Sequence, residues 1–430
     1  MHVLIKEDFI HYLWKFSLFD ISNLTDIQGE KIQILNVGTH NKNAGPDFFN
    51  AKLVIDGQLW AGNVEIHIKS SDWYVHHHEQ DSTYDNVILH VVWEHDVAVF
   101  RADNSRIPTF VIQPYISKKL ISNYYQLFSK SNPFIFCEND IQFIDKFTLN
   151  NFIDSLYIER LQQKSVLILD LLKELNNDWE AVLFVLLSKN FGLKVNGDSF
   201  FNLAQSFDFS VFRKNSNDVF KIEALLFGQA GLLNLELSDD DYFIKLSEEY
   251  QFLKNKYQLS SLHKSEIQFF RLRPANFPTI RLSQLANLYA NNQGLFSKLM
   301  NTYALDDFYK LLTVSTSIYW KTHYSFYTTS KKSVKKLTKA FIDLVLINTI
   351  IPLQFVYQQY IDQLEEDKII SLIKQIKPEK NSIIQKFKEI KISSSNALET
   401  QALIQLKNTY CIKQRCLECV VGNKLLRKTE

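Results

Sequence analysis

The chain contains very few of the residues that usually interrupt regular secondary structure. Of its 430 residues, 11 are glycine and 8 are proline, well below the usual ~7% and ~5%. A protein built mainly of short strands needs a turn every ~8–12 residues, so the composition argues against an all-β sandwich. Because 46% of the residues are hydrophobic and 22% are charged, the chain can form a sizeable core. We therefore expect a helix-rich globular protein of two or three domains.

The net charge and the cysteine content exclude further classes of protein. A net charge of +1 argues against a protein that coats nucleic acid with its whole surface, although a local basic groove is compatible with it. Four cysteines are too few for a disulfide scaffold. The first residues include acids where a signal peptide needs a basic and then an apolar region. We expect a cytoplasmic protein with reduced thiols.

One apolar stretch, residues 341–356, needs a separate explanation. It contains Asp343, Asn348 and Pro352, and a membrane span normally needs about 18 or more uninterrupted apolar residues. We therefore expect a buried helix here and no membrane partner.

The turn-forming residues and the histidines are unevenly distributed. Five glycines, three prolines and nine of the eleven histidines lie before residue 115. This distribution predicts an α+β protein: a small N-terminal α/β domain with a mixed sheet over residues 1–130, followed by a larger all-α domain over residues 131–430 that carries a cysteine-containing C-terminal tail.

Hydrophobic periodicity places the elements. A first helix is expected within residues 6–19. Alternation of polar and apolar residues predicts strands at 31–37, 48–54, 58–69, 86–93 and 109–112. Helical spacing predicts helices at 152–175, 180–187, 221–233, 240–256, 282–289, 331–348, 361–376 and 397–410.

The predicted hairpin 48–69 carries polar groups on one face. Glu65, His67 and Lys69 alternate with apolar residues, so they share a strand face. If residues 55–57 form a three-residue loop, Asp47 lies directly opposite Glu65. A two-residue turn would shift the register by one and separate them.

The register would then need a compensating irregularity. A β-bulge at Gly62-Asn63 would bring Asp47 and Glu65 back into alignment after a two-residue Asp56-Gly57 turn. The candidate site therefore depends on a register that a structure can check.

Two carboxylates held together repel unless a cation lies between them. Paired oxygen ligands suit Mg²⁺ or Mn²⁺, and such an ion can hold a water molecule and stabilise charge at a phosphodiester. We expect Asp47 and Glu65 as metal ligands, with His67 or Lys69 orienting or deprotonating the water. A non-catalytic structural or interaction protein, with these acids in internal ion pairs, would have the same pattern.

The same residues resemble a known superfamily. Pro46-Asp47, a hairpin and then Glu65-Ile66-His67, all preceded by a predicted helix, resemble the PD-(D/E)xK nucleases over about residues 5–115. The resemblance implies a restriction-endonuclease-like fold, metal-dependent hydrolysis of phosphodiesters and a nucleic-acid partner. This sequence has His67 where the superfamily has lysine, so either His67 replaces it or Lys69 reaches in.

The histidines open a third interpretation. His67, the run His76-His77-His78 and His90 could supply three imidazoles to a zinc ion with an open position, as in zinc hydrolases. Their spacing matches no recognised zinc motif. The pattern favours a surface loop for residues 76–78 and a hydrogen-bonded core position for His90.

The four cysteines have a suggestive spacing. Cys411, Cys416 and Cys419 follow the C-x4-C-x2-C pattern of plant-type iron–sulfur ligands, with Cys137 as a distant fourth. Four thiolates also suit structural zinc, and four plain thiols packed as small apolar groups are the alternative. On one continuous helix Cys411 would point away from Cys416, so a shared site requires a loop near 411–415. Some nucleases of the superfamily above close their fold with one upstream and three C-terminal cysteines, in a similar outline but with a different spacing.

A proline-rich elbow carries three arginines. Pro274 and Pro278 enforce non-helical backbone, and Arg271, Arg273 and Arg281 are candidates to hold backbone phosphates. An ordered loop with arginine–carboxylate pairs is the alternative.

Taken together, several strings resemble an uncharacterised bacterial family of unknown function over nearly the whole chain. The strings are residues 43–48, 64–67, 71–73, 87–92, 271–281 and 416–419. This resemblance identifies relatives and implies no activity.

Overall fold

The chain folds into two compact units. The computed structural model describes residues 4–131, 133–233, 239–263, 266–326 and 328–428. Unit 1 comprises residues 1–152, 389–392 and 406–430, and unit 2 comprises residues 153–388 and 393–405. This division differs from the expected boundary at residue 130, because the C-terminal segment returns to the N-terminal unit. Local sequence patterns carry no information about such a return.

Unit 1 contains a mixed sheet, and the α+β class is as predicted. Its strands follow the order β1-β2-β4-β5-β6-β7, with β3 paired to β4. The pairs from β1 to β5 are antiparallel, whereas β5–β6 and β6–β7 are parallel. The strands are β1 Leu24–Thr25, β2 Lys31–Asn36, β3 Thr39–His40, β4 Phe48–Ile55, β5 Gln58–Lys69, β6 Val87–Glu94 and β7 Thr109–Val111.

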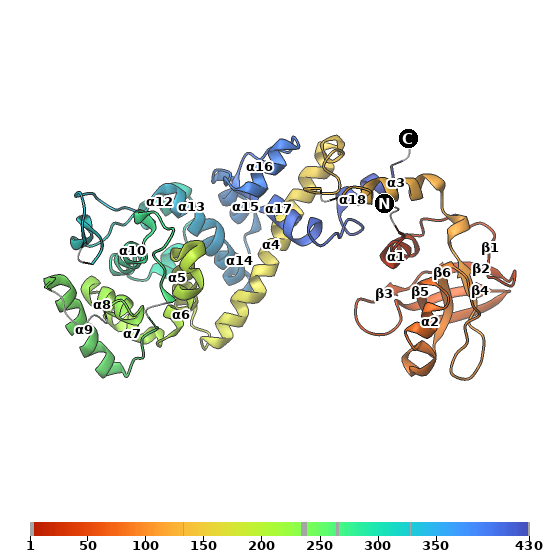
Figure 1. Ribbon diagram of the computed structural model, residues 1–430, viewed down its shortest axis with the longest axis horizontal. Helices are drawn as coiled ribbons and strands as arrows, with labels where there is room; N and C mark the ends of the chain where they lie inside the picture. The colour runs from red at the N-terminus through yellow and green to blue at the C-terminus, as the bar shows by residue number, and fades with distance from the viewer. Residues whose placement is uncertain (1–3, 132, 234–238, 264–265, 327, 429–430) are drawn as a thin grey trace. The chain divides into compact units, whose positions relative to one another are not determined.

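Besides the sheet, the described residues of unit 1 contain the helices α1 Glu7–Lys15, α2 Asp72–Val75, α3 Lys118–Phe128 and α18 Val420–Leu426 (Figure 1). Helix α1 contacts β5 and buries Phe9, Ile10 and Leu13, among others. Helix α2 lies in the crossover between β5 and β6, where Trp73 packs in a small apolar cluster. Helix α18 lies beside α3 although the two are far apart in sequence, and Asn123 Nδ2 donates to the Leu426 carbonyl at 2.9 Å.

Unit 2 is almost entirely helical. Its helices are α4 Lys146–Glu174, which begins in unit 1, then α5 Trp179–Phe191, α6 Leu193–Gln205, α7 Phe209–Asn215, α8 Val219–Gln229, α9 Asp241–Tyr257, α10 Pro278–Ala290, α11 Leu295–Met300, α12 Leu305–Leu312, α13 Lys339–Val345, α14 Ile351–Tyr360, α15 Glu366–Gln375, α16 Ser382–Glu389, which ends in unit 1, and α17 Ala397–Gln405. A short hairpin of β8 His323–Ser325 and β9 Thr328–Thr329 is added. The helix predicted at 331–348 starts later, at Lys339, because the Thr338 side chain accepts from the Phe341 N–H and caps it there.

The apolar stretch of unit 2 is a core helix. The 22 residues Lys339–Tyr360, which join α13 and α14 through a π-helical segment at Leu346–Ile350, are long and apolar enough to cross a membrane by composition. However, 72% of the most apolar window is buried inside the protein. The prediction of a buried helix is therefore confirmed.

Candidate functional site

Two features set the register of the β4–β5 hairpin: its two-residue turn and a β-bulge. Ile55 pairs with Gln58, so the turn contains two residues, Asp56 and Gly57, both with positive φ (48° and 81°). Positive φ at both positions is typical of a type I′ turn, which matches the strand twist. Of the two turns considered from the sequence, the structure therefore has the two-residue Asp56-Gly57 turn and not the three-residue loop 55–57.

A β-bulge then corrects the register. Phe48 pairs with Val64, whereas Ala51 pairs with Gly62, so β4 contains one extra residue between these pairs. Asn50 lies in this bulge with φ 57°, and its N–H donates to Asn63 Oδ1 at 3.4 Å. The compensating bulge exists at the predicted level of the hairpin, but in β4 and not at Gly62-Asn63. The next position after the Phe48 pair aligns Asp47 with Glu65.

The two predicted acidic groups are adjacent. The Asp47 N–H donates to Glu65 Oε2 at 3.1 Å, and the Ile66 N–H donates to Asp47 Oδ2 at 2.9 Å. Helix α1 adds an imidazole, since His11 Nε2 lies 3.1 Å from Asp47 Oδ2 and 3.9 Å from Glu7 Oε1. The site thus combines the end of a hairpin with one face of a helix.

Burial and mutual repulsion disfavour charge on these acids. Burial, reinforced by the charge of Asp47, raises the pKa of Glu65 to about 9. Burial also raises the pKa of Glu7 to about 7; His11 opposes this shift, and Asp47 and Glu65 add to it. Burial alone would lower the pKa of His11, but its hydrogen bond to Asp47 and the nearby carboxylates raise it. The cluster therefore holds protons at neutral pH unless another cation is present.

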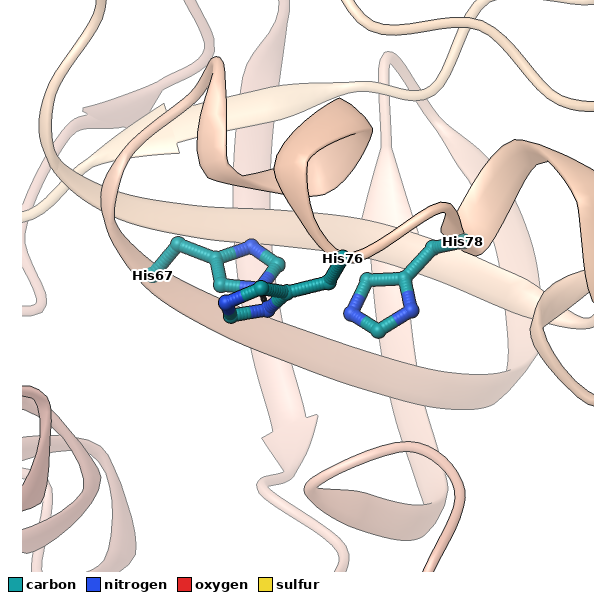
Figure 2. A group of neighbouring side chains, drawn as sticks. All are labelled: His67, His76 and His78. Atoms are coloured by element: carbon teal, nitrogen blue, oxygen red, sulfur yellow. Dashed lines mark hydrogen bonds between the residues drawn. The ribbon is translucent and has the colours of Figure 1, made fainter.

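Three imidazoles lie together (Figure 2), and two of them approach the Glu65 carboxyl group. His67 projects from β5, and His76 and His78 project from the segment after α2, with one ring nitrogen of each within 4.8 Å of the others. His67 Nε2 lies 3.1 Å from His76 Nδ1. Glu65 Oε1 lies 3.2 Å from His78 Nε2 and 3.6 Å from His67 Nε2.

A further histidine supports His67 from inside the sheet. His90 on β6 is fully buried, and its Nε2 lies 2.8 Å from His67 Nδ1. This contact occupies one nitrogen of His67 and leaves the other, Nε2, directed at the site. Burial and the neighbouring imidazoles lower the pKa of His67 to about 2 and that of His90 to about 3. Both rings are therefore neutral at pH 7.

The donor set fits a divalent cation. Neutral imidazole nitrogens and carboxylate oxygens are ligands for zinc and manganese. His78 Nε2 is buried and makes no hydrogen bond within the described part of the chain, although its ring stacks on Tyr84 with centroids 3.8 Å apart. Because His78 Nε2 lies 3.2 Å from Glu65 Oε1, a cation bound here would contact both the imidazole nitrogen and the carboxylate oxygen.

Several of these residues were not predicted from the sequence. Glu7 and His11 were missed, although their i, i+4 spacing beside the apolar positions of α1 places them on one helix face. Residues 76–78 were expected to form a surface loop, with a zinc site shared with His67 and His90 as the alternative. His76 and His77 are exposed, but His78 is buried.

Lys69 stands apart from the converging groups. It is the last residue of β5, its side chain is exposed, and its N–H donates to Asp72 Oδ2 at 2.9 Å. His67, and not Lys69, lies against Glu65.

The arginine elbow does not form one exposed phosphate-binding surface. Arg271 and Arg273 are exposed, whereas Arg281 is 7% exposed in unit 2. The Arg281 guanidinium donates to Gln284 Oε1 at 2.9 Å and Asn276 Oδ1 at 2.6 Å, and lies 3.7 Å from the centre of the Phe341 ring. The Arg281 side chain is buried and bonded to Gln284 and Asn276. The expectation that all three arginines hold phosphate together is therefore not supported.

The four cysteines come together within unit 1. Cys137, Cys411, Cys416 and Cys419 line the same small cavity and none is in a disulfide. The loop required near 411–415 is present, because the π-helical segment Leu406–Cys411 ends there and α18 begins at Val420.

Comparisons with known proteins identify a family for the chain but indicate no activity. A family model described as "Protein of unknown function (DUF2851)" matches residues 7–382. No curated protein and no solved structure is significantly similar to the chain.

Proposed function

The chain belongs to the DUF2851 family of proteins of unknown function, and we propose, from the site itself, that it is a metal-dependent phosphodiesterase of the nuclease type. The observation that carries the proposal is the β4 bulge, which aligns Asp47 with Glu65 beside Glu7 and His11. A strand face that only contacts water has no need to place Asp47 beside Glu65 with Glu7 of α1 nearby, because neighbouring carboxylates repel one another.

The substrate class rests on the arrangement of the motif. A helix, Pro46-Asp47, a hairpin and Glu65-Ile66-His67 resemble the PD-(D/E)xK nucleases, which implies a restriction-endonuclease-like core in unit 1 and DNA or RNA as the partner. His67 occupies the position of the superfamily's lysine.

Asp47, Glu65 and Glu7 would hold Mg²⁺ or Mn²⁺. A bound ion would supply a water molecule of lowered pKa and would stabilise negative charge at the phosphorus. His67 is neutral with a low pKa, so it suits orienting a water molecule better than removing its proton. His11, whose pKa is raised, is the imidazole that most readily carries positive charge beside Asp47.

The direct test is cleavage by the purified full-length protein. Single- and double-stranded DNA and RNA are incubated with Mn²⁺, Mg²⁺, Zn²⁺ or EDTA. We expect cleavage of at least one substrate with Mn²⁺ or Mg²⁺ and none in EDTA. If no substrate is cleaved and calorimetry detects no Mn²⁺ binding, the proposal fails and the acids are structural.

A second candidate function is a zinc hydrolase. It is favoured by the three ring nitrogens of His67, His76 and His78 within 4.8 Å, an arrangement that suits zinc with an open position. Because His67 belongs to both proposals, the two are separated at His76.

Replacing His76 is expected to weaken zinc uptake. His76→Ala removes a ligand and should lower the affinity for zinc, added beyond any that the purified protein holds, by at least ~10-fold. The matched control is His77→Asn, since His77 is exposed with φ 60° and Asn tolerates this left-handed conformation. A competition titration with a zinc indicator measures both proteins. Equal affinity in the two variants would rule out the histidine site.

A further inference from the structure

All four cysteines of the chain gather at one place in unit 1, and none of them is among the residues used above. Cys137 comes from the segment after α3, and the other three come from residues 411–419, on either side of a chain excursion of more than 250 residues. They line one small cavity of about 10 Å³, although in the described part of the chain no three of their sulfur atoms lie within the 4.8 Å that separates the ring nitrogens of His67, His76 and His78. If the cysteines served only to pack the core, there would be no physical cause for all four to lie around the same cavity.

The four thiols act on one another electrostatically. Cys137 and Cys419 are buried, and Cys411 and Cys416 are half-buried. Burial raises the pKa of Cys137 well above its usual value, and the three other cysteines raise it further. Burial raises the pKa of Cys411 to about 12, with Cys419 and Cys416 adding to the shift. A metal ion reverses this tendency, because a coordinating thiol is deprotonated outright.

The backbone around Cys416 and Cys419 is hydrogen-bonded and closely packed. The Cys419 N–H donates to the Cys416 carbonyl at 3.3 Å. Burial raises the pKa of Cys419, and hydrogen bonds from the backbone N–H groups of Gly422 and Val421 to its side chain oppose that shift. A Cβ atom at Gly422 would lie 2.0 Å from the Cys416 carbonyl oxygen, so glycine is required. Backbone donors to a sulfur are the outer contacts that orient metal thiolates.

We infer that Cys137, Cys411, Cys416 and Cys419 form a four-thiolate metal centre that fastens residues 406–430 to the rest of unit 1. Four cysteine ligands are the set that both structural zinc and iron–sulfur clusters use. The centre is separate from the proposed hydrolytic site, and neither inference depends on the other. Because such a site does not exist in the unfolded chain, binding the metal also stabilises the fold.

The test begins with the metal content of full-length protein purified without oxygen. Zinc, iron and acid-labile sulfide are measured together with the visible spectrum. We expect either about one tightly held zinc per chain without colour, or iron with sulfide and a visible absorption band. Wild-type protein with neither zinc nor iron above trace amounts would overturn the inference.

Variants locate the metal. Cys416→Ser is expected to lower the content of that metal by at least ~10-fold and to lower the thermal unfolding midpoint, whereas His76→Ala should retain it. If the metal is zinc, Cys416→His restores a ligand and should recover binding. Metal retained in full by Cys416→Ser would overturn the assignment.

A measurement on the unaltered protein covers the case in which Cys416→Ser fails to fold. A mercurial reagent is titrated into native wild-type protein while released metal is followed with a chromogenic chelator. Release in proportion to thiol modification supports the four-thiolate centre. Complete thiol modification with no metal released contradicts it.

Discussion

Asp47→Asn is expected to reduce metal-dependent phosphodiester cleavage by about 10³-fold or more, the scale reached when an essential catalytic group is removed. Asparagine keeps the size of the side chain and an oxygen that can accept from the Ile66 N–H, which now donates to Asp47 Oδ2 at 2.9 Å. It removes the negative charge that a cation at this position requires. Initial rates in Mn²⁺ on the best substrate measure the effect.

The matched control for this variant lies in the same hairpin. Asp56→Asn makes the same chemical change in the exposed turn at the opposite end, where φ is 48° and asparagine is well suited to the type I′ conformation. We expect the Asp56→Asn protein, purified in parallel, to keep wild-type activity. Equal rates for Asp47→Asn and wild type would assign the cleavage to a contaminant or another site.

Glu65→Gln is expected to stabilise the metal-free protein progressively as the pH rises from 5 to 9. The pKa of Glu65 in the folded protein is about 9, against an ordinary value of 4.5. Between these values the folded state holds a proton that the unfolded state has lost, so wild-type stability falls with rising pH. Each pH unit in this interval costs about 1.4 kcal/mol for one group. Glutamine cannot titrate and avoids this loss.

The experiment compares urea unfolding of wild type and Glu65→Gln in EDTA at several pH values. The difference between the two proteins isolates Glu65, because His67 and His90 are present in both. The lowered pKa values of these two buried rings destabilise both proteins as the pH falls below about 6.5, which is the opposite pH dependence to that of Glu65. Glu7, whose pKa is raised to about 7, contributes to both curves. A free-energy difference that does not change with pH would contradict the environment described for Glu65. Added Mn²⁺ is expected to restore wild-type stability at high pH and to have little effect on the variant.

The sequence predicted the strands of the site and the alignment of Asp47 with Glu65, but it placed the compensating bulge in the wrong strand. Strand β5 has the predicted bounds, and β4 differs by one residue, because alternating apolar residues report directly on which side of a strand is buried. The alignment depends on long-range packing. Strand β3 pairs with Phe48 and Phe49 next to the bulge, and a Cβ at Gly38 would lie 2.6 Å from the Phe49 carbonyl oxygen.

The convergence of the remaining groups is also a tertiary property. Glu7 and His11 reach Asp47 because α1 packs on β5, and no local pattern states which strand a helix will cover. Arg281 looked like a phosphate ligand by residue type, but its position on α10 directs it toward Phe341. The four cysteines line one cavity, and the sequence could suggest this meeting because three of them are close in sequence and Cys137 is the one that remains.

The path of the chain through unit 1 has a consequence for biosynthesis. Residues 153–405, nearly all of them belonging to unit 2, separate the sheet from the segment that completes its unit. At ~5–20 residues per second, the ribosome needs roughly 13–50 s to deliver Cys411, Cys416 and Cys419 after the N-terminal part has emerged. During that interval Cys137 lacks the other three cysteines, and the face of α3 that contacts α18 in the finished protein is not yet covered by it. The N-terminal unit is therefore the first to be synthesised and the last to be completed.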